Sequence, residues 1–220
     1  MNDAGVLELA TRSPIAIGQL RKIFQHPDDP DLLVKVVRAD AITARWGGAK
    51  RWYKRIPRAL HYTGYVRELK EYIAIQARSP GANPPIARMV GIVPTDLGLG
   101  LVSEKVRDDH GAPGPTLAKL YEQHHGYAPW IEDALKVFVR DLQACNVIVG
   151  DLHAWNLVYG SDARGGPRLV LVDGFGEKNI IPANSISRAF NRWNNGRLYR
   201  RMRQQLIDLV KLPSAPTTPL

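Results

Sequence analysis

The chain has 220 residues, of which 45% are hydrophobic and 23% are charged, a composition typical of a globular protein with one large domain or two small lobes. Its formal net charge is +9, and Cys145 is its only cysteine, which excludes an internal disulfide framework and favours a reducing compartment. The sequence shows no signal peptide and no run of 18 apolar residues, so we expect a cytoplasmic protein without a membrane span.

The positive charge is concentrated in two segments. Residues 38–58 contain seven Lys or Arg against one Asp, and residues 177–211 contain eight against two, so each segment carries +6 and the remainder carries −3. Such segments attract phosphates, nucleic acid or anionic lipid, and an anionic partner at either segment is therefore one prediction. The alternative is that both are solvated basic faces.

Paired strands are predicted over residues 15–37. The last of them, residues 32–37, is an apolar run interrupted only by Lys35. Because burial of a single ammonium group in an apolar strand is costly, Lys35 is either a functional residue or lies on the exposed face of an edge strand. Arg21 and Lys22 fall in an earlier predicted turn, where they either supply positive charge to bound phosphates or, as is more common for basic residues in a turn, are solvated.

Residues 38–62 are predicted to form a basic insertion. Its aromatic residues, which lie among the charges, are Trp46, Trp52 and Tyr53. A segment of this kind either stacks on nucleic acid and neutralises it or folds its aromatic side chains back onto the rest of the lobe, and we favour the second interpretation.

A helix is predicted over residues 63–78, since a threonine can cap its start and the prolines that follow forbid its continuation. Its apolar residues at helical spacing, which predict the buried face, are Val66, Leu69, Ile73 and Ala77. Residues 86–93 and 99–106 are predicted to pair as strands around a turn. The polar, Gly- and Pro-rich residues 107–115 are the predicted linker to a helical second half.

The second half begins with two predicted helices, residues 116–124 and 130–144. The apolar residues at helical spacing in the longer one are Ile131, Leu135, Phe138, Leu142 and Cys145, and Cys145 is expected to be a small core residue. Beyond residue 176, two more helical patterns are predicted on either side of a break at residues 194–196. The first pattern consists of Ile186, Phe190 and Trp193, and the second of Leu198, Met202, Leu206 and Leu209. Residues 212–220 are a predicted disordered tail.

The most informative stretch lies between these helices. An apolar run ends at Asp151, and two further apolar runs joined by a Gly/Asp/Pro turn predict a β-hairpin. Asn156 precedes the outgoing strand and Asp173 follows the returning one, so antiparallel pairing places them close together with Asp151 nearby. Two carboxylates and an amide oxygen suit Mg²⁺, which prefers hard oxygen ligands and shares them with phosphate. The alternative is that these residues only make turns.

Residues 150–156, GDLHAWN, resemble the catalytic loop of the kinase-like superfamily, in the His-containing form of aminoglycoside and choline phosphotransferases. The D-x-x-x-x-N spacing matches, and Asp173 opens D-G-F-G, which looks like a one-residue variant of the metal-binding D-F-G. The longer sequence around these motifs, GDLHAWNLVYG followed by LVDGFGEKNIIP, is most similar to the PhoP-regulatory-network (YrbL-type) family of kinase-like bacterial proteins. The resemblance covers residues 15–210 and is specific around 147–182.

For the second half of the chain, the resemblance implies that Asp151 is the catalytic base and that Asn156 and Asp173 are metal ligands. His153 is expected either to act near the transferred phosphate or to pack under the loop. The implied fold is α+β and two-lobed, like a protein kinase, with an N-lobe over residues 1–106 that holds a small antiparallel sheet and a helix. A short helical C-lobe covers residues 116–211 and contains the hairpin.

For the N-lobe, the resemblance implies that Lys35 holds the α- and β-phosphates of ATP and pairs with a glutamate of the 63–78 helix. Glu71 fits this role best, and Glu68, one turn earlier, is the alternative. Backbone groups from Glu104 to Val106 are expected to bind adenine. The sequence departs from the protein-kinase pattern because it has no G-x-G-x-x-G motif.

These features predict an ATP- and Mg²⁺-dependent phosphotransferase. Only residues 177–211 follow the D-G-F-G motif before the tail, which leaves little room for a peptide-binding platform, so a small-molecule acceptor is favoured over a protein. The short C-lobe and the missing glycine motif also fit a kinase-like protein that binds nucleotide, or regulates, without transferring phosphate. A nucleic-acid or anionic-surface binder that uses the two basic segments is the third possibility.

Overall fold

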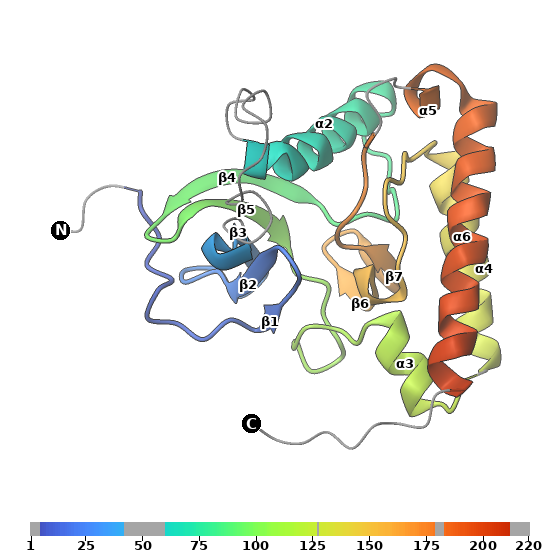
Figure 1. Cartoon of the computed structure of the whole chain (residues 1–220), viewed down its shortest axis with the longest axis horizontal. Coiled ribbons are helices and arrows are strands. Elements are labelled where there is room, and N and C mark those ends of the chain that lie inside the picture. Colours follow the sequence, from blue (N-terminus) through green and yellow to red (C-terminus); the bar gives the residue numbers. More distant parts are fainter. Residues whose placement is uncertain (1–4, 42–59, 127, 179–182, 212–220) are drawn as a thin grey trace, which may run out of the picture. The chain divides into compact units, whose positions relative to one another are not determined.

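The structure is a computed structural model that describes residues 5–41, 60–126, 128–178 and 183–211. The chain divides into two units: the first contains residues up to 72 together with 87–105, and the second contains residues 73–86 and those from 106 onward (Figure 1). Most of the predicted basic insertion, residues 42–59, lies outside the described residues, as do Trp46, Trp52 and Tyr53 and the predicted tail at 212–220.

Five antiparallel strands form the sheet of the first unit. They are β1 (Ala16–Ile17), β2 (Arg21–Gln25), β3 (Leu32–Val37), β4 (Met89–Thr95) and β5 (Gly98–Glu104). Their order is β1-β2-β3-β5-β4, so β3 is a central strand. The apolar cluster that packs against the sheet consists of Leu9, Phe24, Val34, Val36 and Val102. The strands predicted over 15–37, 86–93 and 99–106 are confirmed, with small shifts of their ends.

The predicted helix over residues 63–78 is confirmed as α2 (Thr63–Arg78), which follows the 3₁₀ turn η2 (Leu60–Tyr62). Its predicted buried face is wrong, because Val66 and Ile73 are 60% and 61% exposed. The buried residues of the helix are instead Tyr65, Glu68, Glu71 and Ile75. The hydroxyl of Tyr65 donates to the carbonyl oxygen of Lys35 at 2.6 Å. Apolar periodicity does not detect a helix face that is buried through polar contacts of this kind.

The second unit begins with the helices α3 (Leu117–Gln123) and α4 (Pro129–Ala144). Thr116 caps α3, because its side chain accepts a hydrogen bond from the backbone nitrogen of Lys119 at 3.2 Å. Of the residues predicted to face inward, Ile131, Leu135, Phe138 and Leu142 are buried, whereas Cys145, at the C-terminal cap of α4, is only partly buried. The 3₁₀ turn η3 (Ala154–Asn156) then leads into a hairpin of β6 (Leu157–Asp162) and β7 (Gly165–Leu171). Both helices and the hairpin are confirmed.

The unit ends with α5 (Ala183–Ile186) and the long helix α6 (Arg188–Lys211). The predicted break at residues 194–196 is wrong, since α6 continues through it. Asn191 and Asn195 are buried in this helix, and their side-chain amides both donate to the carbonyl oxygen of Val147, at 3.0 and 2.9 Å. Asn195, which belongs to the predicted break, thus supplies a buried hydrogen bond from within the helix.

Residues 107–115, the predicted linker, belong to the second unit and are hydrogen-bonded to its hairpin. Arg107 and Ser161 exchange two backbone hydrogen bonds of 2.9 and 2.8 Å, and the amide of Tyr159 donates to the carbonyl oxygen of Pro115 at 2.9 Å. The fold is mixed α+β, with an antiparallel sheet and several helices, as predicted. Among the residues described, no helix combines the length and the apolar character needed to cross a membrane.

Candidate functional site

The β6–β7 hairpin places two of the predicted site residues at the same end. Leu157 pairs with Leu171 in the antiparallel register. Next to this pair, the amide nitrogen of Val172 donates to the carbonyl oxygen of Asn156 at 2.8 Å. Since Asp173 follows Val172 directly, the backbones of Asn156 and Asp173 lie at the same end of the hairpin.

Asp151 reaches this end through the segment that precedes the hairpin. The amide nitrogens of Gly150 and Asp151 both donate to the carbonyl oxygen of Gly174, at 2.9 and 2.8 Å. Gly174 has a φ of +85°, and a Cβ atom there would lie 2.4 Å from the carbonyl oxygen of Asp151. Only glycine satisfies both conditions without strain. The additional glycine of D-G-F-G thus allows the close approach of the Asp151 segment.

The carboxylate of Asp151 is held by two basic neighbours. Its Oδ1 lies 2.7 Å from Nε2 of His153, and its Oδ2 lies 2.7 Å from Nζ of Lys178. Because an ionised carboxylate only accepts hydrogen bonds, His153 donates through Nε2. Its other ring nitrogen, Nδ1, lies 3.1 Å from the side-chain amide of Gln205 on α6; in the neutral ring Nδ1 accepts, so the amide NH2 of Gln205 is the group that donates to it. The orientation of Asp151 is therefore fixed by a chain of side-chain contacts that extends to α6.

Lys178 and Gln205 are site candidates that sequence reasoning misses. Lys178 lies within the basic segment 177–211, and the charge count gives no reason to single it out. Its position two residues after the D-G-F-G motif is the one local signal that points to it. Gln205 is 52 residues away from its partner His153, and no local pattern connects them.

The predicted oxygen donors fit a magnesium ion chemically. Asp151 and Asp173 offer carboxylates and Asn156 offers an amide oxygen, all hard ligands of the kind that Mg²⁺ prefers. Within the described part of the chain, no three His, Cys, Asp or Glu side chains gather closely enough to hold a metal ion. Since both oxygens of Asp151 are engaged by His153 and Lys178, a magnesium ion held by Asn156 and Asp173 needs phosphate oxygens or water to complete its six ligands.

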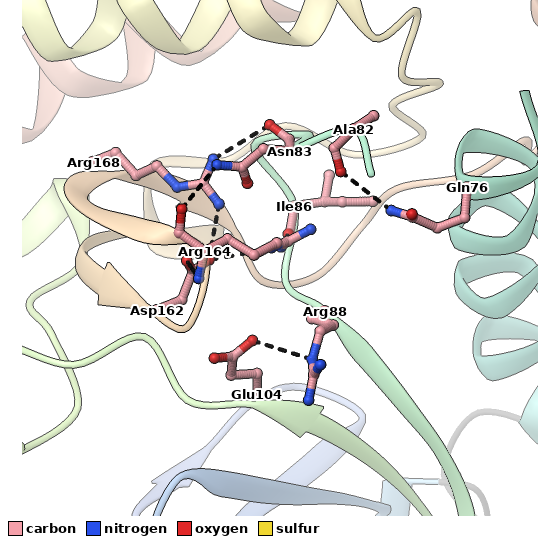
Figure 2. A network of polar contacts seen from close by, with 9 residues as sticks. All are labelled: Gln76, Ala82, Asn83, Ile86, Arg88, Glu104, Asp162, Arg164 and Arg168. Atoms are coloured by element: carbon pink, nitrogen blue, oxygen red, sulfur yellow. Dashed lines mark hydrogen bonds and ion pairs between the residues drawn. The ribbon is translucent and has the colours of Figure 1, made fainter. Parts of the chain in front are cut away.

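A buried charged cluster anchors the turn end of the hairpin (Figure 2). Asp162 binds Arg168 at 2.8 Å and lies 3.6 Å from Arg164. Arg164 donates to the carbonyl oxygen of Ile86 at 2.6 Å, and Asn83 donates to the carbonyl oxygen of Arg164 at 3.2 Å. The hairpin is therefore held to the 73–86 segment of the same unit at its turn, while the predicted site residues lie at the opposite end.

In the first unit, Lys35 is buried in the middle of the sheet. It pairs with Ile23 of β2 and Leu101 of β5, and only 2% of it is exposed. Val34 and Val36 belong to the apolar cluster, so the side chain of Lys35 lies on the opposite face of the sheet. The alternative that Lys35 lies on the exposed face of an edge strand is therefore wrong.

Both candidate glutamates lie on the buried face of α2, with Glu68 0% and Glu71 5% exposed. Glu68 is bound by two nitrogens of the Arg21 guanidinium, at 2.9 and 3.1 Å. The same guanidinium lies 5.0 Å from the ring centroid of Tyr65. The expectation that Arg21 is solvated in a turn is wrong, because it lies in β2 and pairs with a carboxylate far along the chain. Glu68 therefore has a structural partner.

The predicted adenine-binding residues lie on either side of the boundary between the two units. Glu104 ends β5, its amide donates to the carbonyl oxygen of Arg88 at 2.9 Å, and its carboxylate lies 3.4 Å from Nε of Arg88 (Figure 2). Val106 is buried in the second unit, where its carbonyl oxygen accepts a hydrogen bond from Gly114 at 2.9 Å. One backbone group of each residue is thus already bonded within its own unit.

The second basic segment is described except for residues 179–182. Five of its arginines are exposed on α6: Arg188, Arg192, Arg197, Arg200 and Arg201. Two cavities of about 540 and 380 Å³ lie along α4 and α6. The basic residues that line them are Lys136, Arg140, Arg188 and Arg192. Most of the first basic segment, 38–58, lies outside the described residues.

Comparison with known proteins assigns the family. A family model described as "PhoP regulatory network protein YrbL" matches residues 7–207. The chain belongs to the YrbL family. The "Uncharacterized protein YrbL" of Escherichia coli strain K12 is 28% identical over 201 residues, which cover 89% of this chain and 86% of the relative. The protein of the same description from Shigella flexneri matches with the same identity and the same coverage. The YrbL-type resemblance of the sequence is thereby confirmed.

Proposed function

We propose that this YrbL-family protein is a kinase-like phosphotransferase that moves the γ-phosphoryl group of ATP to a hydroxyl of a small molecule. The observation that carries the proposal is the meeting of the Asp151, Asn156 and Asp173 segments at one end of the hairpin through three backbone hydrogen bonds. The division of a mixed α+β chain into two units supports a two-lobed, kinase-like arrangement.

Asp151 acts as the base in this proposal. The acceptor hydroxyl oxygen forms a bond to the γ-phosphorus, the bond from this phosphorus to the β,γ-bridging oxygen breaks, and ADP leaves. Asp151 receives the hydroxyl proton. His153 and Gln205 keep the carboxylate of Asp151 oriented toward the acceptor. Asn156 and Asp173 would hold magnesium, which when bound neutralises negative charge on the phosphates.

Lys178 supplies a positive charge beside the base. Its ammonium group lies 2.7 Å from Asp151, so a phosphoryl group that is transferred next to Asp151 comes within reach of the same ammonium. Charge that builds up on the phosphoryl oxygens during transfer is stabilised by a cation held in this way. Lys178 therefore stabilises the transferred phosphoryl group, a role for which the sequence of the loop suggests His153.

In the first unit, Lys35 holds the α- and β-phosphates. Because Glu68 is bound by Arg21, Glu71 is the glutamate that we assign to Lys35. Adenine binds to backbone groups between Glu104 and Val106. A buried lysine on a central strand is costly unless its charge is compensated, which favours a functional role for Lys35 over an incidental one.

Turnover of ATP in the presence of a panel of hydroxylated small molecules tests the proposal. Wild type should release ADP in an acceptor-dependent manner, and Asp151→Asn should lower this rate by roughly 10²- to 10⁴-fold, as expected for removal of a general base. The matched control is Asp133→Asn, which removes an exposed carboxylate from α4 and should leave the rate unchanged. Equal rates in wild type and Asp151→Asn would contradict the assignment of the base.

A second candidate is a regulatory protein that binds nucleotide without transferring phosphate. The ion pair between Asp151 and Lys178 favours it, since Lys178 occupies one of the carboxylate oxygens that a base would offer to an acceptor hydroxyl. The words "regulatory network" in the family description point the same way. Magnesium-dependent nucleotide binding with no ADP release for any acceptor would support this candidate over the phosphotransferase.

A further inference from the structure

The exposed side of the last two helices carries an apolar stripe that the proposed phosphotransfer does not use. Ile186, Phe190 and Trp193 are 77%, 40% and 57% exposed. Phe190 and Trp193 lie three residues apart on one side of α6, whereas Ile186 is the last residue of α5 and is separated from α6 by Ser187, which caps α6. The Phe190 and Trp193 rings touch, with centroids 5.5 Å apart. Phe190 and Trp193 therefore form one aromatic surface that faces solvent, and Ile186 is exposed four residues before it; these three residues are called the stripe.

The packing of α6 explains why this side is exposed. The residues of α6 that face the interior of the second unit are Asn191, Asn195, Leu198, Met202 and Leu206, all buried. They recur every three or four residues and take up the opposite side of the helix. Among the described residues, the interior of the unit is thus packed without the stripe, which stays exposed.

The charge around the stripe has one sign. No Asp or Glu occurs between Lys178 and Ile207, whereas exposed arginines continue along α6 from the stripe. Arg197 lies with its guanidinium 5.9 Å from the Trp193 ring, and Arg200 and Arg201 follow one turn later. Among the described residues, no carboxylate is paired with Arg200 or Arg201. The surface therefore combines apolar side chains with uncompensated positive charge.

We propose that this outer face of α5 and α6, defined by Ile186, Phe190, Trp193, Arg197, Arg200 and Arg201, docks on the surface of an anionic lipid bilayer. The apolar side chains enter the boundary between headgroups and acyl chains, and the arginines bind lipid phosphates, as in other peripheral amphipathic helices. The proposal concerns location and is independent of the proposed phosphotransfer.

The composition of this outer face favours lipid over the two other possible partners. Nucleic acid attracts the arginines equally well, but its bases and phosphates do not provide an apolar environment that would bury Ile186, the most exposed of the apolar residues. A second copy of the chain presents the same positive surface and is repelled in a symmetric contact. Of these three partners, the anionic bilayer is the one that can both pair with the arginines and bury the aliphatic side chain of Ile186.

Co-sedimentation of the full chain with vesicles tests the proposal. Vesicles that contain phosphatidylglycerol should bind the chain, and vesicles of phosphatidylcholine alone should bind it at least roughly tenfold more weakly. Trp193→Ser and Ile186→Ser should each weaken binding to the anionic vesicles by roughly tenfold. Val66→Ser is the matched control, because Val66 is an exposed apolar residue on α2 of the first unit, and it should bind like wild type.

The role of charge is tested with two double variants of equal net charge. Arg200→Gln/Arg201→Gln should weaken binding by roughly thirtyfold at low salt. Lys70→Gln/Lys119→Gln removes two exposed lysines elsewhere and should have a much smaller effect. Thermal unfolding of each variant checks that it is folded. The proposal would be overturned if wild type did not bind anionic vesicles, or if both double variants lost binding equally. It would also be overturned if the chain bound duplex DNA or single-stranded RNA and the serine variants left that binding unchanged.

Discussion

The ammonium group of Lys178 lies 2.7 Å from the carboxylate of Asp151, although 27 residues separate them in the chain. Both side chains are partly exposed, at 39% and 42%, so the pair faces solvent and is open to a ligand. An ion pair with this exposure adds little to stability, because water screens it. The pair instead places a solvent-accessible positive charge beside the proposed base.

Lys178→Met should therefore lower ATP turnover without unfolding the protein. Loss of one charge that stabilises the transferred phosphoryl group is expected to slow the reaction by roughly 10²- to 10³-fold. The free energy of unfolding should change by less than about 1 kcal/mol. The measurement is ADP release, with Lys119→Met as the control on an exposed lysine of α3. Unchanged turnover in Lys178→Met would remove Lys178 from the mechanism.

The ion pair between Arg21 and Glu68 behaves differently because it is buried, at 13% and 0% exposure. Arg21→Met removes the guanidinium while Glu68 stays inside the first unit, and loss of one partner of a buried pair costs about 3–5 kcal/mol. Urea unfolding measures this loss. Arg12→Met, at an exposed arginine, should stay within about 0.5 kcal/mol of wild type. Similar stabilities for Arg21→Met and Arg12→Met would show that Glu68 does not depend on Arg21.

Three helices of the second unit meet at Glu132. Its carboxylate accepts hydrogen bonds from the hydroxyl of Tyr121 at 2.5 Å and from the guanidinium of Arg203. Burial pushes the pKa of Glu132 upward, but these two bonds and the charge of Arg203 outweigh it, so the pKa lies below its ordinary value of 4.5. A carboxylate whose pKa is lower in the folded state binds its proton more readily when the chain is unfolded.

The sign of the pH dependence follows from this difference. The stabilisation from Glu132 is fully present above its unfolded pKa of 4.5 and is lost as the pH falls through the lower folded pKa. Wild type should therefore be more stable than Glu132→Gln at pH 7, and the gap should close as the pH falls below about 4.5. Urea unfolding of both proteins between pH 7 and pH 3 measures the gap. A gap that stays constant over this range would contradict the assigned shift.

The order and type of the elements are accessible from the sequence because the signals are local. The cap at Thr116, the apolar positions of α4 and the Gly/Asp/Pro turn of the hairpin each act over a few residues. The neighbourhood of Asn156 and Asp173 is also accessible, since antiparallel pairing of two predicted strands brings their outer ends together. Local pattern and pairing geometry are sufficient for these features.

The parts that sequence reasoning misses depend on contacts between polar residues far apart in the chain. The buried face of α2 follows from the bonds of Tyr65 and Glu68 to β3 and β2, and apolar periodicity points to the wrong face. The helix α6 continues through residues 194–196, where Asn195 indicates a turn in the sequence but donates instead to the carbonyl oxygen of Val147. The sequence around such a side chain does not show which distant residue it bonds to.

The measurement that tests the central claim most directly is thermal unfolding with and without Mg²⁺–ATP on wild type, Asp173→Asn and Asp133→Asn. A ligand at one hundred times its dissociation constant stabilises the folded state by about 2.7 kcal/mol, so wild type and Asp133→Asn should show the same metal-dependent rise in melting temperature. Asp173→Asn should lose this rise. No shift in wild type at millimolar ATP, or an equal shift in Asp173→Asn, would contradict a nucleotide site built on this hairpin.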